Sequence, residues 1–220
     1  MDNFFPIALS FKCALLSALI AAPWGIFWGW LLARKNFPGK IFVQTILYMP
    51  LVLPPVLTGY ILLSLLGKYS WLGKFIEQIF NTSFVLDWKG IVLASSVVAS
   101  PFMIQTVKEA VEKVDERLEM AARNLGADFL YVLMTVTFPL AWRGIIAGFF
   151  LVFARSIGEF GATIMVAGNI PGKTQTIPSA IFGRVQLGQE DSILPLVLAA
   201  FVFSYLGLGA SYLFNKRTKP

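Results

Sequence analysis

Long uncharged runs decide what this chain of 220 residues can fold into. Four of them contain no charged residue: Cys13–Ala33, Ile41–Gly67, Gly90–Val107 and Ser192–Asn215. Each reaches the roughly 18 to 20 residues with which a helix crosses the hydrocarbon core of a bilayer. Hydrophobic residues make up 57% of the sequence, which exceeds their share in soluble domains. The sequence therefore predicts an all-α integral membrane protein that crosses a cell membrane several times and contacts its lipid.

A fifth apolar run follows a charged segment in the middle of the chain. Between Gly144 and Gly168 only Arg155 and Glu159 are charged, so we predict a span here as well. The five predicted spans are residues 8–33, 41–67, 90–107, 143–168 and 192–214, with a charged segment at residues 108–142. Together they are expected to form a single transmembrane domain over residues 1–220.

Basic residues are sorted by loop, and this sorting predicts the orientation of the chain. The segments after the first, third and fifth spans hold most of them: Arg34, Lys35, Lys40, Lys108, Lys113, Arg117, Arg123, Arg143, Lys216, Arg217 and Lys219. Short loops rich in Lys and Arg stay on the cytoplasmic side of a membrane. We therefore expect the N-terminus outside and residues 108–142 in the cytoplasm. Topology also accounts for the net charge of +6, so no nucleic-acid partner is expected.

The segment Leu118–Leu140, which we call the docking insert, has the pattern of a helix, a turn and a second helix. Apolar side chains recur at i, i+3, i+4 and i+7, on one face of the first helix: Leu118, Ala121, Ala122 and Leu125. Gly126 is expected to end this helix in the left-handed conformation, and Asp128 to cap the second helix. Pro139 is expected to bend the second helix as it enters the next span.

This spacing resembles the EAA loop of ABC-importer permeases, in which Glu-Ala-Ala is followed after three residues by Gly, and after nine more by Ile-x-Leu-Pro. Ala121 and Ala122 precede Gly126 by the family's interval. Val136, Phe138 and Pro139 occupy the Ile, Leu and Pro positions. The family's glutamate falls on Met120, and Glu119 stands one residue earlier, about 100° around a helix. The resemblance implies that the insert docks a cytosolic ATPase through a set of seven residues: Glu119, Met120, Ala121, Ala122, Gly126, Asp128 and Pro139.

Composition excludes several kinds of active site. The chain has no His and one Cys, so His or thiolate metal sites, Ser-His and Cys-His nucleophilic pairs, and internal disulfides are unavailable. The nearest approach to a phosphate-binding loop is Gly168–Thr174, which has three residues between its glycines where a P-loop has four. We therefore expect no enzyme activity, no catalytic or metal site and no cofactor on this chain. If ATP drives the protein, a separate subunit binds ATP and Mg²⁺.

Arg155 and Glu159 stand four residues apart near the middle of the fourth predicted span. A lone arginine at that depth costs about 2.5 to 3.5 kcal/mol on insertion scales, so a paired carboxylate one turn away is expected. Two roles remain open for this pair. It neutralises itself against a neighbouring helix, lines a transport path, or does both.

A proline cluster and several hydroxyl side chains are further candidates for that path. Pro50, Pro54 and Pro55 interrupt the second span, and irregular backbone at membrane depth is either buried in protein or lines a water-filled cavity. A packing kink and a pore role are both open. The candidate donors to a tetrahedral oxyanion are Thr58, Ser95, Ser96, Ser100, Ser156 and Thr163, although Ser and Thr also bond their own helix carbonyls. Weak neutral donors suit transport, because a tightly held anion would not be released.

The phrase GEFGATIMVAGNIPGKTQT, at Gly158–Thr176, resembles the molybdate permease branch of the family, which also includes sulfate permeases. Tyr48–Tyr60 and Leu93–Phe102 share this resemblance, which covers most of Leu51–Ile181. It implies the fold of a type I importer, with two copies of this chain, two cytosolic ATP-binding-cassette subunits and an external oxyanion-binding protein. Molybdate is the favoured cargo, and tungstate and sulfate are the alternatives. A more distant alternative is a stand-alone secondary transporter or channel, but five spans without an internal repeat argue against it.

Overall fold

The computed structural model describes residues 3–80, 82–189 and 192–216, and within these ranges the chain is helical and contains no strand. The helices are α1 (Phe4–Arg34), α2 (Lys40–Val52), α3 (Pro55–Leu66), α4 (Trp71–Phe80), α5 (Trp88–Glu112), α6 (Glu116–Asn124), α7 (Phe129–Val132), the π-helix η1 (Leu133–Thr137), α8 (Phe138–Ile157), α9 (Gly161–Ala167), α10 (Ile177–Gln186) and α11 (Leu194–Lys216). The predicted all-α fold is confirmed.

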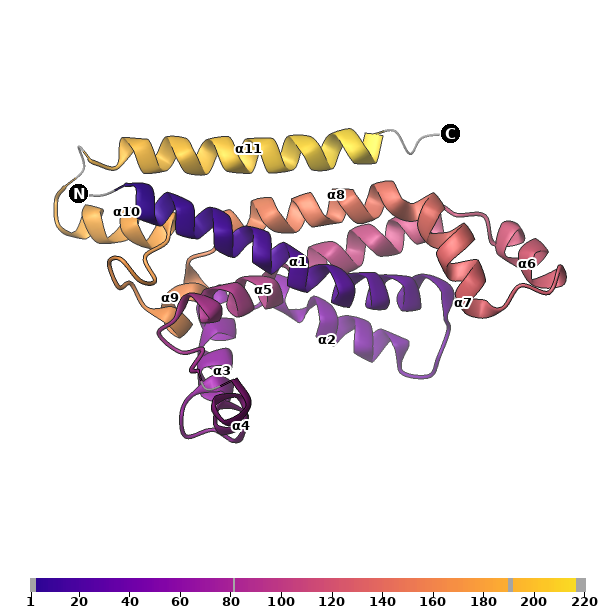
Figure 1. Ribbon diagram of the computed structural model, residues 1–220, viewed down its shortest axis with the longest axis horizontal. Helices are drawn as coiled ribbons and strands as arrows, with labels where there is room; N and C mark the ends of the chain where they lie inside the picture. The colour runs from indigo at the N-terminus through magenta and orange to yellow at the C-terminus, as the bar shows by residue number, and fades with distance from the viewer. Residues whose placement is uncertain (1–2, 81, 190–191, 217–220) are drawn as a thin grey trace.

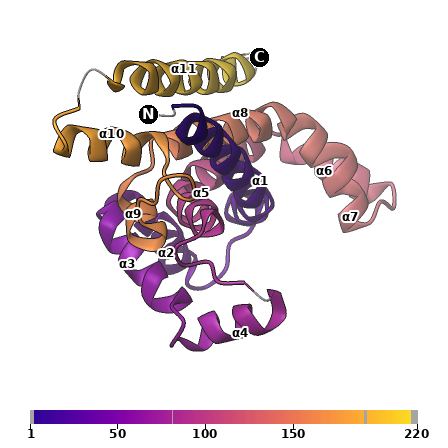
Figure 2. The same ribbon diagram turned by 60° about the vertical axis from the view of Figure 1, so that its left-hand side comes forward.

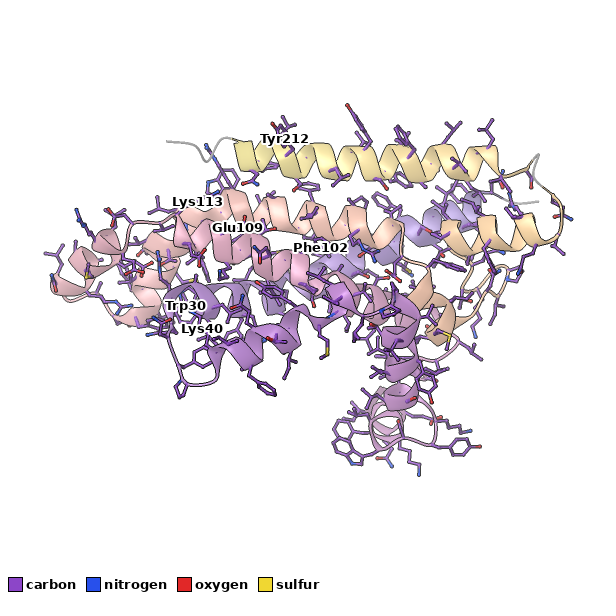
Figure 3. All side chains as sticks on the ribbon, turned by 180° about the vertical axis from the view of Figure 1, so that it is seen from behind. Trp30, Lys40, Phe102, Glu109, Lys113 and Tyr212 are labelled. Atoms are coloured by element: carbon purple, nitrogen blue, oxygen red, sulfur yellow. The ribbon has the colours of Figure 1, made fainter. Side chains whose placement is uncertain are left out.

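Among the described residues, four helices are long and apolar enough to cross a membrane, and they lie along the long axis of the molecule (Figure 1). They are α1, α5, the continuous helix Phe129–Ile157 and α11. The helices α1, α5 and α8 pack on one another and form the core, and α11 lies against α8. Most of α11 is exposed, including Tyr212 at 65% (Figure 3), as expected of a helix that faces lipid.

Small residues let α1 and α5 approach closely. A Cβ atom added to Gly29 of α1 would lie 2.7 Å from Val107 Cβ, closer than side-chain carbons pack. Ala14, Ala18 and Ala21 continue this contact along α1 and are all buried. Close backbone approach over small residues is the usual way in which membrane helices gain packing energy. It makes α1 an integral part of the bundle.

The second predicted span, residues 41–67, is two helices rather than one. The helices α2 and α3 meet at an angle of 111°. Leu53 and Pro54 each precede a proline and are held in extended conformations, at ψ 140° and 130°, because a proline ring disfavours the helical conformation of the residue before it. As a result α3 leaves the bundle almost crosswise and carries α4 away from it (Figures 1 and 2). The helix α3 packs against α9.

The fourth span also has different bounds from the predicted residues 143–168. It runs from Phe129 to Ile157, and the rest of the predicted segment forms the separate short helix α9. Gly158 follows the last helical residue, and Glu159 begins the link to α9. The helix α5 likewise continues to Glu112, beyond the predicted border at residue 107. Charged residues mark where a chain leaves the hydrocarbon core, but a helix continues past the membrane edge until a turn residue ends it.

Candidate functional site

The first helix of the docking insert, α6, projects from one end of the bundle (Figure 1). Asp115 caps it by accepting a hydrogen bond from the Arg117 N–H at 2.9 Å. Glu116 lies in the first turn and Arg123 in the last, and both charges are favourable to the helix dipole at those positions. Trp30, Glu109 and Lys113 lie at the same end of the molecule (Figure 3), which the basic loops assign to the cytoplasm.

The turn at Gly126 ends α6 as predicted. Its φ is +89°, in the left-handed region that glycine adopts without penalty. The Gly126 N–H donates to the Arg123 carbonyl at 2.9 Å, and the Ala127 N–H donates to the Ala122 carbonyl at 3.1 Å. This pair of bonds is a Schellman motif. A Cβ on Gly126 would meet nothing within 4 Å, so backbone conformation alone requires glycine here.

The second helix of the insert begins at a cap and enters the membrane through a π-helical turn. The Asp128 carboxylate accepts a hydrogen bond from the Tyr131 N–H at 2.7 Å, which is the predicted capping role. The π-helix η1 ends at Thr137, two residues before Pro139. In an α-helix the proline ring would crowd the carbonyl of Thr135, and a wider turn relieves that contact.

The predicted docking face is open to a partner. Leu118 is 50% exposed, Met120 54% and Leu125 90%. An open hollow of about 510 Å³ is lined by Ala122, Leu125, Gly126, Ala127, Asp128 and Tyr131. Ala121 is exposed as well, and so is Pro139, which lies outside the hollow. Apolar side chains that the chain itself leaves uncovered at this end indicate a surface for another protein.

Among the seven residues predicted to dock the ATPase, Glu119 is the exception, because it faces the protein and is only 8% exposed. Its Oε1 accepts hydrogen bonds from Arg34 Nε at 3.0 Å and from Thr137 Oγ1 at 2.9 Å. In the sequence, Arg34 stands out only as one of the basic residues that indicate the orientation of the chain. Arg34 and Glu119 are 85 residues apart, and nothing local in either segment predicts that they meet.

Arg155 and Glu159 form the expected ion pair, with Arg155 Nη2 2.8 Å from Glu159 Oε2. The sequence predicts one helix through both residues, but α8 ends at Ile157. Glu159 lies beyond the end of α8, and its Oε1 accepts a hydrogen bond from the Ala162 N–H at 3.0 Å, in the first turn of α9. The carboxylate therefore balances a charge and also caps the next helix. Its side chain is 2% exposed and that of Arg155 is 32% exposed.

The hydroxyl residues predicted for the path fall into two groups. Three of them donate to nearby backbone carbonyls: Ser96 to Leu93 and Ser100 to Val97 within α5, and Thr163 to Glu159 and Phe160 just before α9. The hydroxyls of Thr58 and Ser156 are buried and have no hydrogen-bond partner within the described part of the chain. Ser95 is also buried.

These hydroxyl residues do not gather in one cavity of the single chain. Ser96 and Ser100 line an apolar groove of about 640 Å³ between α1, α2 and α5. Thr58 of α3, Ser156 of α8 and Thr163 of α9 lie outside that groove. Because α3 packs on α9, Thr58 and Thr163 belong to two helices in contact, away from the docking insert.

Two proteins named as transport permeases are similar in sequence to most of this chain. The molybdenum transport system permease protein ModB of Haemophilus influenzae is 45% identical over 212 residues, which are 96% of this chain and 93% of that protein. The sulfate transport system permease protein CysT of Salmonella typhimurium is 35% identical over 201 residues, which are 88% of this chain and 72% of that protein.

The fold also matches a solved transporter. The structure resembles that of the MetNI methionine ABC transporter in an inward-facing form, with a TM-score of 0.73 and 16% identity over the whole of both chains. This likeness shows the fold alone, and it confirms the predicted type I ABC importer permease fold. Residues 22–220 match a single family. The chain therefore belongs to the family described as the binding-protein-dependent transport system inner membrane component.

Proposed function

We propose that this chain is the membrane-spanning permease subunit of an ATP-driven importer for a tetrahedral oxyanion, and that the oxyanion is molybdate. The observation that carries the proposal is the docking insert: an amphipathic helix and turn with exposed apolar side chains at the predicted cytoplasmic end of a bundle. The relative named as a molybdenum permease is more similar to this chain than the sulfate permease, at 45% against 35% identity. That difference supports molybdate over sulfate.

In this proposal two copies of the chain pair around a central path, and each copy carries one cytosolic ATP-binding-cassette subunit on its docking insert. The partner subunits bind and hydrolyse ATP with Mg²⁺, and an external binding protein delivers the anion. When the ATPases close, the two α6 helices approach each other and rock the spans between outward-open and inward-open states. The chain itself performs no covalent step.

Anion contacts along the path are proposed from the residues whose donors are still available. Thr58 and Ser156 have buried hydroxyls without partners within the described residues, whereas Ser96, Ser100 and Thr163 are already bonded to backbone carbonyls. Arg155 stands next to Ser156 and is partly exposed. Neutral hydroxyls and one partly neutralised cation along the same path would attract an oxyanion without trapping it.

The test is uptake of radioactive molybdate into vesicles that contain the complete complex and an excess of external binding protein. We expect uptake that requires ATP and is competed by tungstate more strongly than by sulfate. Uptake that survives ATP depletion would favour a secondary transporter instead. Preferred uptake of sulfate would support an ATP-driven importer but contradict molybdate as its cargo.

Ala122 provides a direct test of the docking surface, because it lines the hollow beside Gly126. Ala122→Glu would bury an unpaired carboxylate against an apolar partner, at a cost of several kcal/mol, and we expect it to release the ATPase. The matched control is Met120→Glu, which adds the same charge two residues away and restores the residue typical of the EAA motif. The measurement is the ATPase content of complexes purified in detergent. Full ATPase content with Ala122→Glu would contradict the assignment.

A further inference from the structure

We propose that Arg34 and Glu119 are positioning residues that fix the docking helix α6 to α1, so that α1 carries the displacement of α6 through the membrane. The inference rests on the proposed function only where it names the ATPase as the agent that moves α6. The attachment itself follows from contacts within this chain.

The buried side chain of α6 is a carboxylate. Within the described residues, Glu119 is the buried residue of α6, while Leu118, Met120 and Leu125 are exposed. Short links hold the two ends of the helix, at residues 113–115 and 125–128. Glu119 therefore supplies a buried attachment between the middle of α6 and the rest of the protein.

The partners of Glu119 come from two other elements. Arg34 lies at the end of α1, with its side chain 7% exposed, and Thr137 lies in η1, 1% exposed. Arg34 Nη2 also donates to the Val114 carbonyl at 2.7 Å, in the link that precedes α6. We call Arg34, Glu119 and Thr137 the inner clamp. Arginine stays charged at any physiological pH, so removing the Glu119 carboxylate would leave a poorly solvated cation with only the exposed Glu116, 3.4 Å away, as its counter-charge.

An aromatic contact supports the inner clamp on the same side of α6. The Trp30 ring of α1 lies 5.3 Å from the ring of Phe129, the first residue of α7. Arg123 of α6 and Lys35 at the end of α1 lie 5.8 Å and 5.9 Å from the same Phe129 ring. The end of α1 therefore contacts both helices of the insert.

The other end of α1 is fixed to α10. The Ile177 N–H at the start of α10 donates to Ser10 Oγ at 2.8 Å, and Arg184 Nη1 donates to Asn3 Oδ1 at 2.6 Å. Between the two ends lie 31 helical residues, or about 46 Å at 1.5 Å per residue. Figure 1 shows α1 running from α10 to α7. Because α10 follows α9, α1 links the docking insert to the segment that packs on α3, through one helix that remains continuous past the internal Pro23.

The test compares two distances in the complex by pulsed spin-label spectroscopy, with Cys13 replaced by Ala. A label on Asn124 in both copies reports the separation of the two α6 helices. Labels on Lys35 and Asn124 within one copy report the position of α6 relative to α1. Trapping the complex with ATP and vanadate should change the first distance and leave the second unchanged. A change in the second distance would overturn the proposal, because α6 would then move independently of α1.

Two substitutions of the same kind separate the inner clamp from the surface of α6. Glu119→Gln removes the buried charge. Glu116→Gln removes a charge that is 68% exposed and 3.4 Å from the same arginine. We expect Glu119→Gln to broaden the Lys35–Asn124 distribution and to lower stimulation of ATP hydrolysis by the binding protein about tenfold, with the ATPase retained. Glu116→Gln should match the wild type. A narrow distribution with normal stimulation in Glu119→Gln would contradict the proposal.

Thr137→Val gives a second route if Glu119→Gln does not assemble. It removes only the hydroxyl donor and should broaden the same Lys35–Asn124 distribution, and an unchanged distribution would count against the inner clamp. Failure of the proposed function is distinguishable from these results. If no ATPase binds the chain, the proposed function fails, but the Lys35–Asn124 distribution of the purified chain still tests the clamp.

Discussion

Replacing Gly126 with Val is expected to abolish stimulation of ATP hydrolysis by the loaded binding protein, while the chain still inserts and folds. The backbone at Gly126 has a φ of +89°, which a β-branched residue adopts only at a cost of roughly 1 to 3 kcal/mol. Valine would relieve this strain by leaving the left-handed region and breaking the two bonds of the Schellman motif. The hollow lined by Ala122 and Tyr131 would then lose its shape.

Gly126→Asn is the matched control, because asparagine is the residue other than glycine that most readily takes the left-handed conformation. No atom crowds the position, so the larger side chain has room. ATP hydrolysis in reconstituted vesicles, with and without loaded binding protein, measures the effect. Normal stimulation in Gly126→Val would show that this turn does not set the docking surface.

The second large effect is expected at the ion pair of Arg155 and Glu159. Removing one partner of a buried pair costs about 3 to 5 kcal/mol, because it leaves the other charge uncompensated. The exposures make the two single changes unequal: Glu159 is 2% exposed and Arg155 32%. Arg155→Gln leaves the more deeply buried Glu159 carboxylate without its partner, so it should lower thermal stability more than Glu159→Gln. The glutamine in Glu159→Gln also retains an oxygen that can accept from the Ala162 N–H.

The double change Arg155→Gln with Glu159→Gln is expected to recover thermal stability and ATPase binding, since no charge is left unpaired. We expect this protein to import molybdate poorly, because an oxyanion crossing a low-dielectric path gains from a fixed positive charge. Melting of the purified complex and molybdate uptake are the two measurements. Normal uptake by the double variant would leave the pair with a purely structural role.

Local interactions made parts of this protein predictable from its sequence. The uncharged runs located α1, α5 and α11, because a membrane requires that composition over a fixed length. The turn at Gly126 and the cap at Asp128 were predictable for a similar reason, since a helix end is specified by the residues within one turn of it. The ion pair of Arg155 with Glu159 was also accessible, at a separation of four residues.

Tertiary contacts and helix breaks could not be predicted from the sequence in the same way. The end of α8 at Ile157 depends on Glu159 capping α9, so the span could not be drawn from hydropathy alone. The prolines at 54 and 55 indicated a break, but the angle of 111° is sustained by the contact of α3 with α9. The role of Glu119 depends on its contact with Arg34. The two residues are 85 positions apart, and no pattern in either segment indicates that they pair.

The π-helical turn η1 has a consequence for how the insert and the membrane span are aligned. A π-helical turn holds one residue more than an α-helical turn, so the two flanking helices are out of phase by about 100° compared with an uninterrupted α-helix. Deleting one residue from Leu133–Thr137 would let the helix become regular and would keep the rotation of the insert about the axis of the span, because the wide turn already absorbs the extra residue. Changing the same five residues into a regular α-helical turn without a deletion would rotate the insert by that angle. The direction in which the docking surface faces is thus set by this one turn, within a helix that otherwise spans the membrane without a break.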